Sequence, residues 1–74
     1  RGEILEMEAQ PGSRLVKGPL KDLKFPENAI IGAILRDGVM QIPNGETQIE
    51  PGERVVVYAL AEAIPRVEKL FARS

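Results

Sequence analysis

The sequence contains no cysteine, no histidine and no tryptophan. Without cysteine the chain cannot form a disulfide or a thiolate metal site. Without histidine or cysteine it cannot build a Ser-His-Asp or Cys-His nucleophilic site. No apolar run is long enough to cross a bilayer, and the chain does not open with a signal-peptide pattern. We therefore expect a module that is not an enzyme and does not insert into a membrane.

The chain also has little charge excess and few aromatic residues. Ten Lys and Arg residues against eleven Asp and Glu residues give a formal net charge of −1. Surfaces that bind nucleic acid carry a cationic excess, which this balance does not supply. The aromatic residues are Phe25, Tyr58 and Phe71, too few for a platform on which bases stack. We expect no nucleic-acid partner.

The length of 74 residues bounds the architecture. A domain of this size buries only about 60% of its unfolded surface, so its stability is marginal unless something supplements the core. A partner subunit is the supplement that we expect. The first residue is Arg1 rather than methionine, which suggests a fragment of a longer protein. We expect residues 1–74 to form a single domain.

Turn signals divide most of the chain into short strands. Asp37-Gly38 lies between two apolar segments and fits a type I′ hairpin turn, which needs positive φ at both central residues. Pro51-Gly52 fits the central pair of a type II turn. The segments between these signals have strand length and strand composition. The expected strands cover residues 3–9, 29–35, 39–42 and 54–60.

Two segments have helical spacing. Leu20 and Leu23, after Pro19, predict a short helix that ends before Pro26. Apolar residues at helical spacing between positions 64 and 71 predict a C-terminal amphipathic helix. The predicted order is β-α-β-β-β-α. This is an α+β fold in which three strands form an antiparallel meander and the C-terminal helix covers one face of the sheet.

The second face of that sheet is also apolar. In the strand at 29–35, simple alternation places Ile30, Gly32 and Ile34 on one face, and the opposite face is apolar as well. Exposed contiguous apolar patches usually mark an interface or a ligand groove, so we expect a homodimer. In the alternative interpretation, the short helix and the N-terminal strand cover this face.

Three motifs together resemble a known family. They are the strand and turn "IIGAILRDG", the following pattern "IP-G-T-I-PG-R" and the closing helix "VEKLF". The chain is similar to the C-terminal lobe of RCK domains, also called the TrkA C-terminal domain, over almost its whole length. The resemblance implies a regulatory, ligand-sensing and dimerisation module of a potassium uptake or transport system, which gates a membrane channel or transporter. The alternative is a purely structural dimerisation module within a transporter or antiporter, binding no ligand.

The resemblance also implies neighbours and a location. An N-terminal nucleotide-binding Rossmann lobe and a membrane potassium channel or transporter subunit are expected in the full-length protein. The module is then cytoplasmic, at the inner face of the plasma membrane, where its transporter partner holds it. The chain itself contains no glycine-rich phosphate loop, so we expect the nucleotide-binding lobe outside this segment.

The ligand implied by the resemblance is cyclic di-AMP or another small regulatory molecule at the dimer interface. In relatives that bind this nucleotide, an asparagine directly precedes an isoleucine pair. Here Ala29 stands in that place and Asn28 lies one position earlier. The alternative for the apolar positions is ordinary strand packing and a turn. The candidate binding residues are Asn28, Ala29, Ile30, Ile31 and Pro43.

The remaining charged residues carry weaker hypotheses. Arg36 ends an apolar strand and could reach a phosphate or carboxylate, although an exposed charge at a strand end is more common. Glu6 and Glu8 share a strand face and could contribute to a calcium site, although a solvated face is more common. We expect no metal site. Solubility and protection of the sheet edge are the roles expected for Glu50, Glu53 and Arg54.

Overall fold

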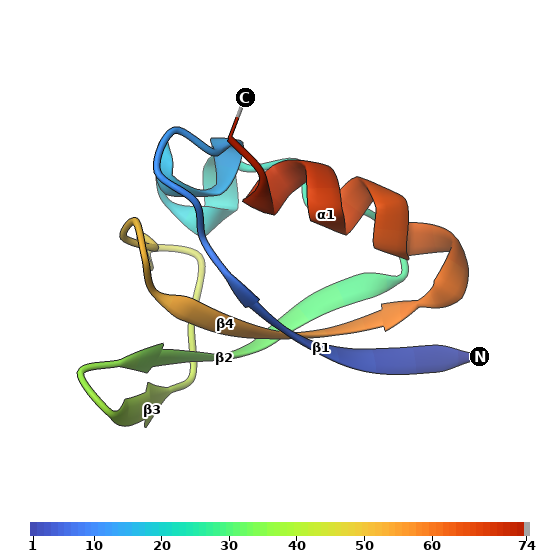
Figure 1. Ribbon diagram of the computed structural model, residues 1–74, viewed down its shortest axis with the longest axis horizontal. Helices are drawn as coiled ribbons and strands as arrows, with labels where there is room; N and C mark the ends of the chain where they lie inside the picture. Colours follow the sequence, from blue (N-terminus) through green and yellow to red (C-terminus); the bar gives the residue numbers. More distant parts are fainter. Residues whose placement is uncertain (74) are drawn as a thin grey trace.

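The structure, a computed structural model, describes residues 1–73 as a four-stranded sheet covered on one side by helical segments (Figure 1). The strands are β1 (Gly2–Glu8), β2 (Ala29–Arg36), β3 (Val39–Gln41) and β4 (Arg54–Leu60). The helical segments are α1 (Ile64–Phe71) and the 3₁₀ turns η1 (Arg14–Val16), η2 (Leu20–Asp22) and η3 (Ala61–Ala63). The expected α+β class is confirmed. In residues 1–73, no helix has the length and hydropathy needed to cross a membrane.

The strand order is β1-β4-β2-β3, and all neighbours are antiparallel. The β2–β3 hairpin forms as predicted, because Asp37 and Gly38 both have positive φ, 52° and 78°. The meander is wrong beyond that point, since β4 pairs with β2 rather than with β3. β3 is only three residues long, and all three are exposed. It therefore offers too little surface for a further strand to pack beside it. Residues 42–53 instead lead the chain back across the sheet. β4 then lies in a central position, between β1 and β2.

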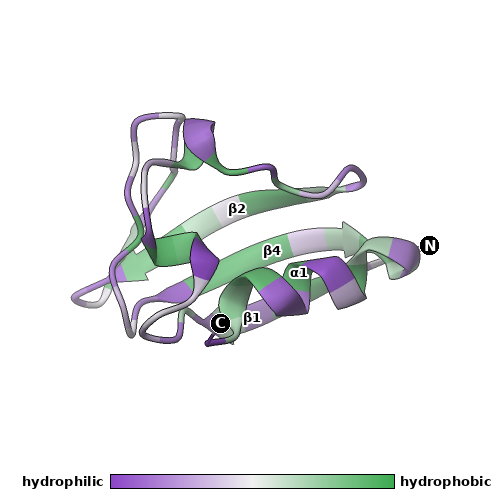
Figure 2. Cartoon of the chain, turned by 90° about the horizontal axis from the view of Figure 1, so that it is seen from above, coloured by the Kyte–Doolittle hydropathy of each residue, from purple (hydrophilic) through white to green (hydrophobic). Residues whose placement is uncertain are grey.

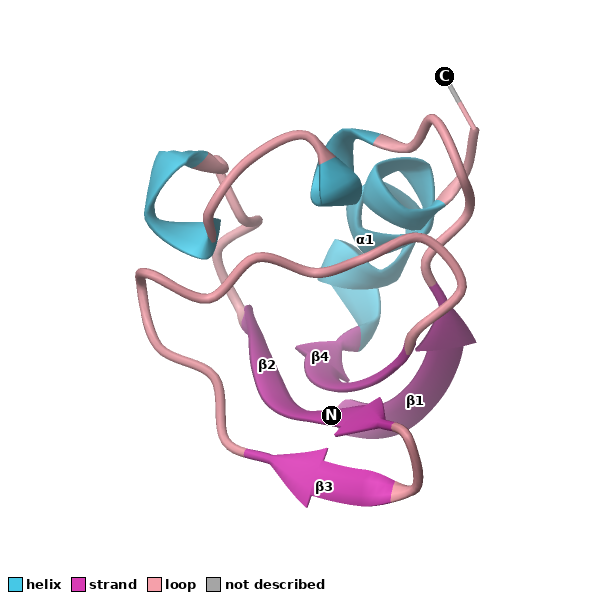
Figure 3. Cartoon of the chain, turned by 90° about the vertical axis from the view of Figure 1, so that its left-hand side faces the viewer, coloured by secondary structure: helices cyan, strands magenta, loops and turns pink. Residues whose placement is uncertain are grey.

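The helical segments all lie on one side of the strands (Figure 3). Phe71 and Val67 of α1 and Leu15 of η1 are buried against strand residues such as Val55 and Val57. The predicted short helix is the 3₁₀ turn η2, and it lies on this same side. The alternative in which it covers the other face, helped by the N-terminal strand, is wrong, because β1 lies within the sheet beside β4.

A β-bulge at Gly32 inverts the faces of β2. The pairing of β2 with β4 shifts register between Ile31 and Ala33. A bulge adds one residue to one strand, so alternation restarts with the opposite phase. Ile34 is therefore in the core, 1% exposed, whereas Ile30 is 63% exposed on the other face. The expectation that the two isoleucines share a face is wrong.

The bulge needs a glycine because an aromatic ring lies against it. A Cβ atom added at Gly32 would come within 2.6 Å of Cε2 of Tyr58 and 3.2 Å of its Cδ2. Real Cβ atoms essentially never lie within 3.0 Å of such a neighbour, so the 2.6 Å contact would force the ring or the backbone to shift. Glycine in a strand interior often marks such a bulge or close approach. The ring of Tyr58 thus lies over the backbone of β2.

The turn at Pro51-Gly52 joins the returning chain to the start of β4. Gly52 has a φ of 87°, and the amide of Glu53 donates to the carbonyl of Glu50 at 3.2 Å. Both features fit the type II turn predicted from the sequence. The amide of Gly52 also donates to the carbonyl of Ala9 at 2.7 Å. The turn is thereby fixed against the chain that leaves β1.

Candidate functional site

The face of the sheet opposite α1 carries an exposed apolar surface, which we call the outer face. Its large exposed side chains are Ile4, Ile30, Met40, Tyr58 and Leu60. Tyr58 of the central strand β4 is paired with Ile4 on one side and with Ile30 on the other. These three side chains form a row across the sheet. Contiguous apolar surface of this kind usually marks a protein or ligand contact.

β2 and β4 are largely hydrophobic along their length (Figure 2), and α1 lies on one side of the sheet (Figure 1). In β4, Val55, Val57 and Ala59 are buried, whereas the alternate residues Tyr58 and Leu60 are exposed. The outer face thus comes from strands that are apolar on both sides and that have a helical layer on one side only.

Two hollows flank Ile30. The first has a volume of about 510 Å³ and includes Asn28, Ala29 and Ile30 together with Ile4 and Tyr58. Its position at the end of the sheet places it next to the row of exposed side chains on the outer face. Its lining includes the acidic Glu3 and contains no lysine or arginine.

The second hollow has a volume of about 290 Å³. It brings together four of the five candidate residues, Ala29, Ile30, Ile31 and Pro43, although Pro43 lies beyond β3. Asn28 lines the first hollow but not the second. The sequence thus identified residues that meet in space, and Ala29 and Ile30 belong to both hollows. Whether they hold a ligand is taken up below as a proposal.

Sequence reasoning missed three residues of the second hollow, Leu20, Phe25 and Asn44. They reach it because η2 is hydrogen-bonded to the returning chain. The amide of Leu20 donates to the carbonyl of Thr47 at 2.9 Å, and that of Lys21 donates to the carbonyl of Gly45, also at 2.9 Å. The signal available in the sequence was the Asn44-Gly45 turn, but its partner segment lies more than twenty residues away.

Asn28 occupies the left-handed region, with a φ of 68°. Asparagine tolerates this conformation better than most residues with a side chain. Its carbonyl accepts a hydrogen bond from the amide of Leu60 at 2.8 Å. Its side-chain amide donates to Oε2 of Glu62 at 3.1 Å. This bond uses one of the two N–H donors of the amide, so a ligand that accepts from the second N–H would bind Asn28 beside Glu62.

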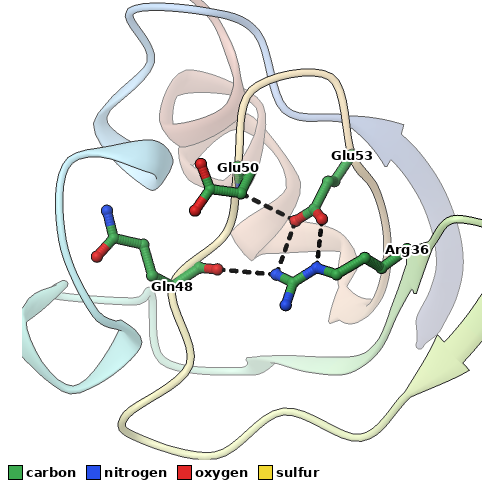
Figure 4. Close-up of polar contacts among 4 residues, drawn as sticks. All are labelled: Arg36, Gln48, Glu50 and Glu53. Atoms are coloured by element: carbon green, nitrogen blue, oxygen red, sulfur yellow. Dashed lines mark hydrogen bonds and ion pairs between the residues drawn. The ribbon is translucent and has the colours of Figure 1, made fainter.

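Arg36 forms a compact polar cluster at the end of β2 (Figure 4). Its Nε and Nη2 donate to the two carboxylate oxygens of Glu53, and Nη2 also donates to the carbonyl of Gln48 at 2.9 Å. The amide of Glu50 donates to Oε1 of Glu53 at 2.9 Å. Arg36 thus binds a carboxylate, one of the two groups that the sequence analysis considered, and this carboxylate belongs to the chain itself. The arrangement does not support a role for Arg36 in binding a phosphate. The edge-protection role expected for Glu53 is wrong, because its carboxylate is mostly buried and organises a turn.

The cluster shifts the protonation equilibria of both partners. Hydrogen bonds from Arg36 are the largest cause that lowers the pKa of the Glu53 carboxyl, and the bond from the Glu50 amide adds to it, against the opposing effect of burial. The same hydrogen bond with Glu53 raises the pKa of Arg36. A bidentate, charge-assisted pair of this kind fixes geometry as well as charge. It ties the end of β2 to the Pro51-Gly52 turn.

The acidic residues of β1 have a simpler arrangement. Glu6 accepts a hydrogen bond from Nε of Arg54 at 2.7 Å, and both side chains are about half exposed. This hydrogen bond raises the pKa of Arg54. Within residues 1–73, no group of three or more acidic side chains is positioned to hold a metal ion.

The family of the chain follows from comparison with known proteins. The model of the TrkA-C domain matches residues 4–72, so the chain belongs to the TrkA-C domain family. This confirms the resemblance found in the sequence. A solved structure described as "Structure of RCK domain with cda" has the same fold, with a TM-score of 0.78 over 93% of this chain and 97% of that one, at 20% identity.

Two relatives illustrate the kind of protein in which this domain occurs. The Trk system potassium uptake protein TrkA of Azorhizobium caulinodans is 46% identical over 70 residues, which is 95% of this chain. The TrkA homolog 2 of Methanosarcina mazei is 42% identical over 71 residues, which is 96% of this chain. The chain spans only 15% and 16% of the length of these two relatives.

Proposed function

We propose that this domain is a regulatory module of a potassium uptake system, which forms a homodimer through its outer face and senses a small molecule there. The relatives named as Trk system potassium uptake proteins support the first part of the proposal. The domain acts by binding rather than by catalysis, at the cytoplasmic face of the membrane. Its neighbours in the longer protein are a Rossmann lobe and a potassium channel or transporter subunit.

The observation that carries the proposal is the pair of hollows that meet at Ile30. The first opens on the uncovered outer face, and the second lies between β2 and the segment of Leu20 and Phe25. Ligand pockets in proteins have volumes of about 300–1,000 Å³ and mostly apolar linings with few polar groups. The two hollows, of about 510 and 290 Å³, are in or near this range, and their linings are largely apolar. A second subunit on the outer face would cover Ile30 and Tyr58 and enclose the space beside them.

The ligand that we propose is cyclic di-AMP or a small molecule with similar flat, polar ring systems. The RCK domain structure described with "cda" supports a ligand in this fold. Ala29, Ile30, Ile31 and Pro43 would supply apolar contacts to the rings. The second N–H of the Asn28 side-chain amide would supply a hydrogen bond beside the one to Glu62.

The regulatory step follows from linkage. A ligand that binds one arrangement of the two subunits more tightly shifts the population toward that arrangement. The rest of the longer protein passes the preference to the pore, and by reciprocity the state of the pore changes the affinity for the ligand. The proposal needs no chemical reaction in this domain.

A second candidate function is a purely structural dimerisation module. It is favoured by the charges of the hollows, since neither is lined by a lysine or arginine that would hold a phosphate. It is also favoured by the engagement of the Asn28 amide with Glu62. In this case the outer face holds two copies together and binds nothing else.

The test is a thermal-shift panel with cyclic di-AMP, ATP, NADH and calcium at several protein concentrations. A ligand that binds only the folded state raises the melting temperature, and a fold that depends on a dimer melts higher at higher concentration. We expect both effects, with cyclic di-AMP as the active compound. A concentration effect without any ligand effect supports the structural module instead. Absence of both effects contradicts the proposal.

A matched pair of variants locates the interface. Ile30→Asp places a charge on the outer face, whereas Val39→Asp places the same charge at an exposed strand position outside it. Sedimentation should show a monomer for Ile30→Asp and an unchanged dimer for Val39→Asp, because an unpaired charge is costly only where the contact buries it. A dimer that survives Ile30→Asp would place the contact elsewhere.

A further inference from the structure

A second surface lies on the side of α1, away from the outer face. Two adjoining hollows of about 460 and 330 Å³ share Arg14, Lys24 and Leu70. The larger one also includes Arg66 and Lys69 of α1. We call the two hollows together the basic groove. Its lining combines segments from the first turn of the chain, the loop before β2 and the C-terminal helix.

The cations of the basic groove converge because of helix geometry and chain packing. Arg66 and Lys69 are three residues apart on α1, and Leu70 is four residues from Arg66, so the three side chains share a helix face. η1 packs against α1 and brings Arg14 to the same place. The fourth cation, Lys24, comes from the loop before β2. The partly buried Phe25 and Leu70 give the groove an apolar floor.

The charge of the basic groove is not neutralised within the chain. Among residues 1–73, none of its four cations forms an ion pair, whereas Lys21, Arg36 and Arg54 each do. Two carboxylates, Asp22 and Glu27, also belong to the lining, so cations outnumber acids by four to two. The chain as a whole carries a net charge of −1. The groove is therefore a cationic site on a molecule without a cationic excess.

We propose that the basic groove docks an acidic peptide segment that carries an apolar side chain. The four cations match several carboxylates along an extended chain, and the floor of Phe25 and Leu70 matches the apolar anchor. Electrostatic complementarity of this kind sets orientation and partner choice more than affinity. A hollow between a helix and a loop suits a narrow chain, whereas a flat or convex basic face would suit a lipid surface.

The expected binding is weak for a free peptide. All four cations are exposed to solvent, and exposed ion pairs contribute little individually. A segment tethered within the same assembly gains a high effective concentration and does not need high intrinsic affinity. The groove lies on the side of α1, so docking leaves the outer face free, and this inference does not rest on the proposed function.

The test uses fluorescence anisotropy of a short fluorescein-labelled peptide of glutamates around one leucine. The double variant Arg66→Gln/Lys69→Gln removes two cations of the groove and keeps good helix formers. The matched control Arg1→Gln/Lys17→Gln removes two cations that do not line the groove. We expect the first variant to weaken binding about tenfold, as the loss of two exposed ion pairs would, and the control to have little effect.

Further measurements separate docking from general attraction. A peptide with glutamine in place of glutamate should not bind, and one with serine in place of leucine should bind more weakly. Affinity should fall as salt rises, because exposed charges are screened. The proposal is overturned if the acidic peptide does not bind, or if both double variants weaken it equally. It is also overturned if only vesicles that contain phosphatidylserine bind at the groove.

Discussion

The two faces of the sheet are made by the same strands and differ in what the rest of the chain does with them. On the α1 side, Val55 and Val57 are fully buried under α1 and η1. On the outer face, Tyr58 of the same strand and Ile30 of the neighbouring strand β2 are exposed. The apolar content of a strand therefore indicates that both faces need cover. It does not indicate which face the chain itself covers.

The largest expected effect separates the two isoleucines of β2. Ile34→Ala removes buried contacts and should cost about 2–5 kcal/mol of the free energy of unfolding. Ile30→Ala should change it by less than about 0.5 kcal/mol at low protein concentration, because the side chain is exposed in the single chain. Urea unfolding of the two variants measures both values.

Protein concentration sharpens this comparison. If the outer face is a subunit contact, the cost of Ile30→Ala should grow as concentration rises, since dimer formation stabilises the folded state by mass action. The cost of Ile34→Ala should not depend on the outer face. If Ile30→Ala and Ile34→Ala lower the free energy of unfolding equally at low concentration, Ile30 is as buried in the single chain as Ile34. That result would contradict the assignment of the two residues to an exposed and a buried face.

A smaller effect is expected at the bulge. Gly32→Ala places a Cβ atom against the ring of Tyr58 and should cost about 1–3 kcal/mol through overpacking. Adding Tyr58→Ala should recover part of this cost, and a double-mutant cycle measures the coupling. Gly18→Ala is the control, because a Cβ atom there meets nothing within 4 Å. Additive effects of Gly32→Ala and Tyr58→Ala would contradict the contact.

The smallest effect concerns the ion pairs on the two sides of the sheet. The pKa of Glu53 is lowered in the folded state, so its carboxylate stabilises the fold at neutral pH. This contribution is present above the ordinary pKa of 4.5 and is lost as the pH falls through the folded-state value. We expect Glu53→Gln to lower the urea midpoint at pH 7, and the difference from the unchanged chain to narrow toward pH 3.

The control for this measurement is Glu6→Gln on the outer face. Its partner Arg54 is about half exposed, and pairs of that kind contribute little to stability. The urea midpoint of Glu6→Gln should stay close to that of the unchanged chain at both pH values. If Glu53→Gln and Glu6→Gln change the urea midpoint equally, the greater burial of the Arg36–Glu53 pair does not contribute to stability.

Local signals predicted the parts of the fold that depend on near neighbours. The turns at Asp37-Gly38 and Pro51-Gly52 were predicted because specific residues are needed for positive φ. The pairing of β4 with β2 was not predicted, because no short sequence signal indicates which strand a later strand will pair with. The bulge was also missed, because Gly32 looks like one more apolar position in a simple alternation.

The candidate site was only partly visible in the sequence. The resemblance to RCK domains pointed to Ala29, Ile30, Ile31 and Pro43, and these four meet around one hollow. The Arg36–Glu53 pair was missed because its partners are separated by 17 residues and are brought together by the returning chain. The sequence indicated that Arg36 could reach a carboxylate, but nothing in it identified Glu53 as the partner.

The central position of β4 determines when this chain can fold as it is synthesised. Its two neighbours, β1 and β2, are both made earlier, and β1 pairs with it across about fifty intervening residues. Until residues 54–60 have left the ribosome, the β2–β3 hairpin is the only strand pairing described in residues 1–73 that can form. Pairing over such sequence separations is slow and leaves strand edges exposed meanwhile. Until β4 is made, β1 therefore has no partner strand and β2 is paired only with β3.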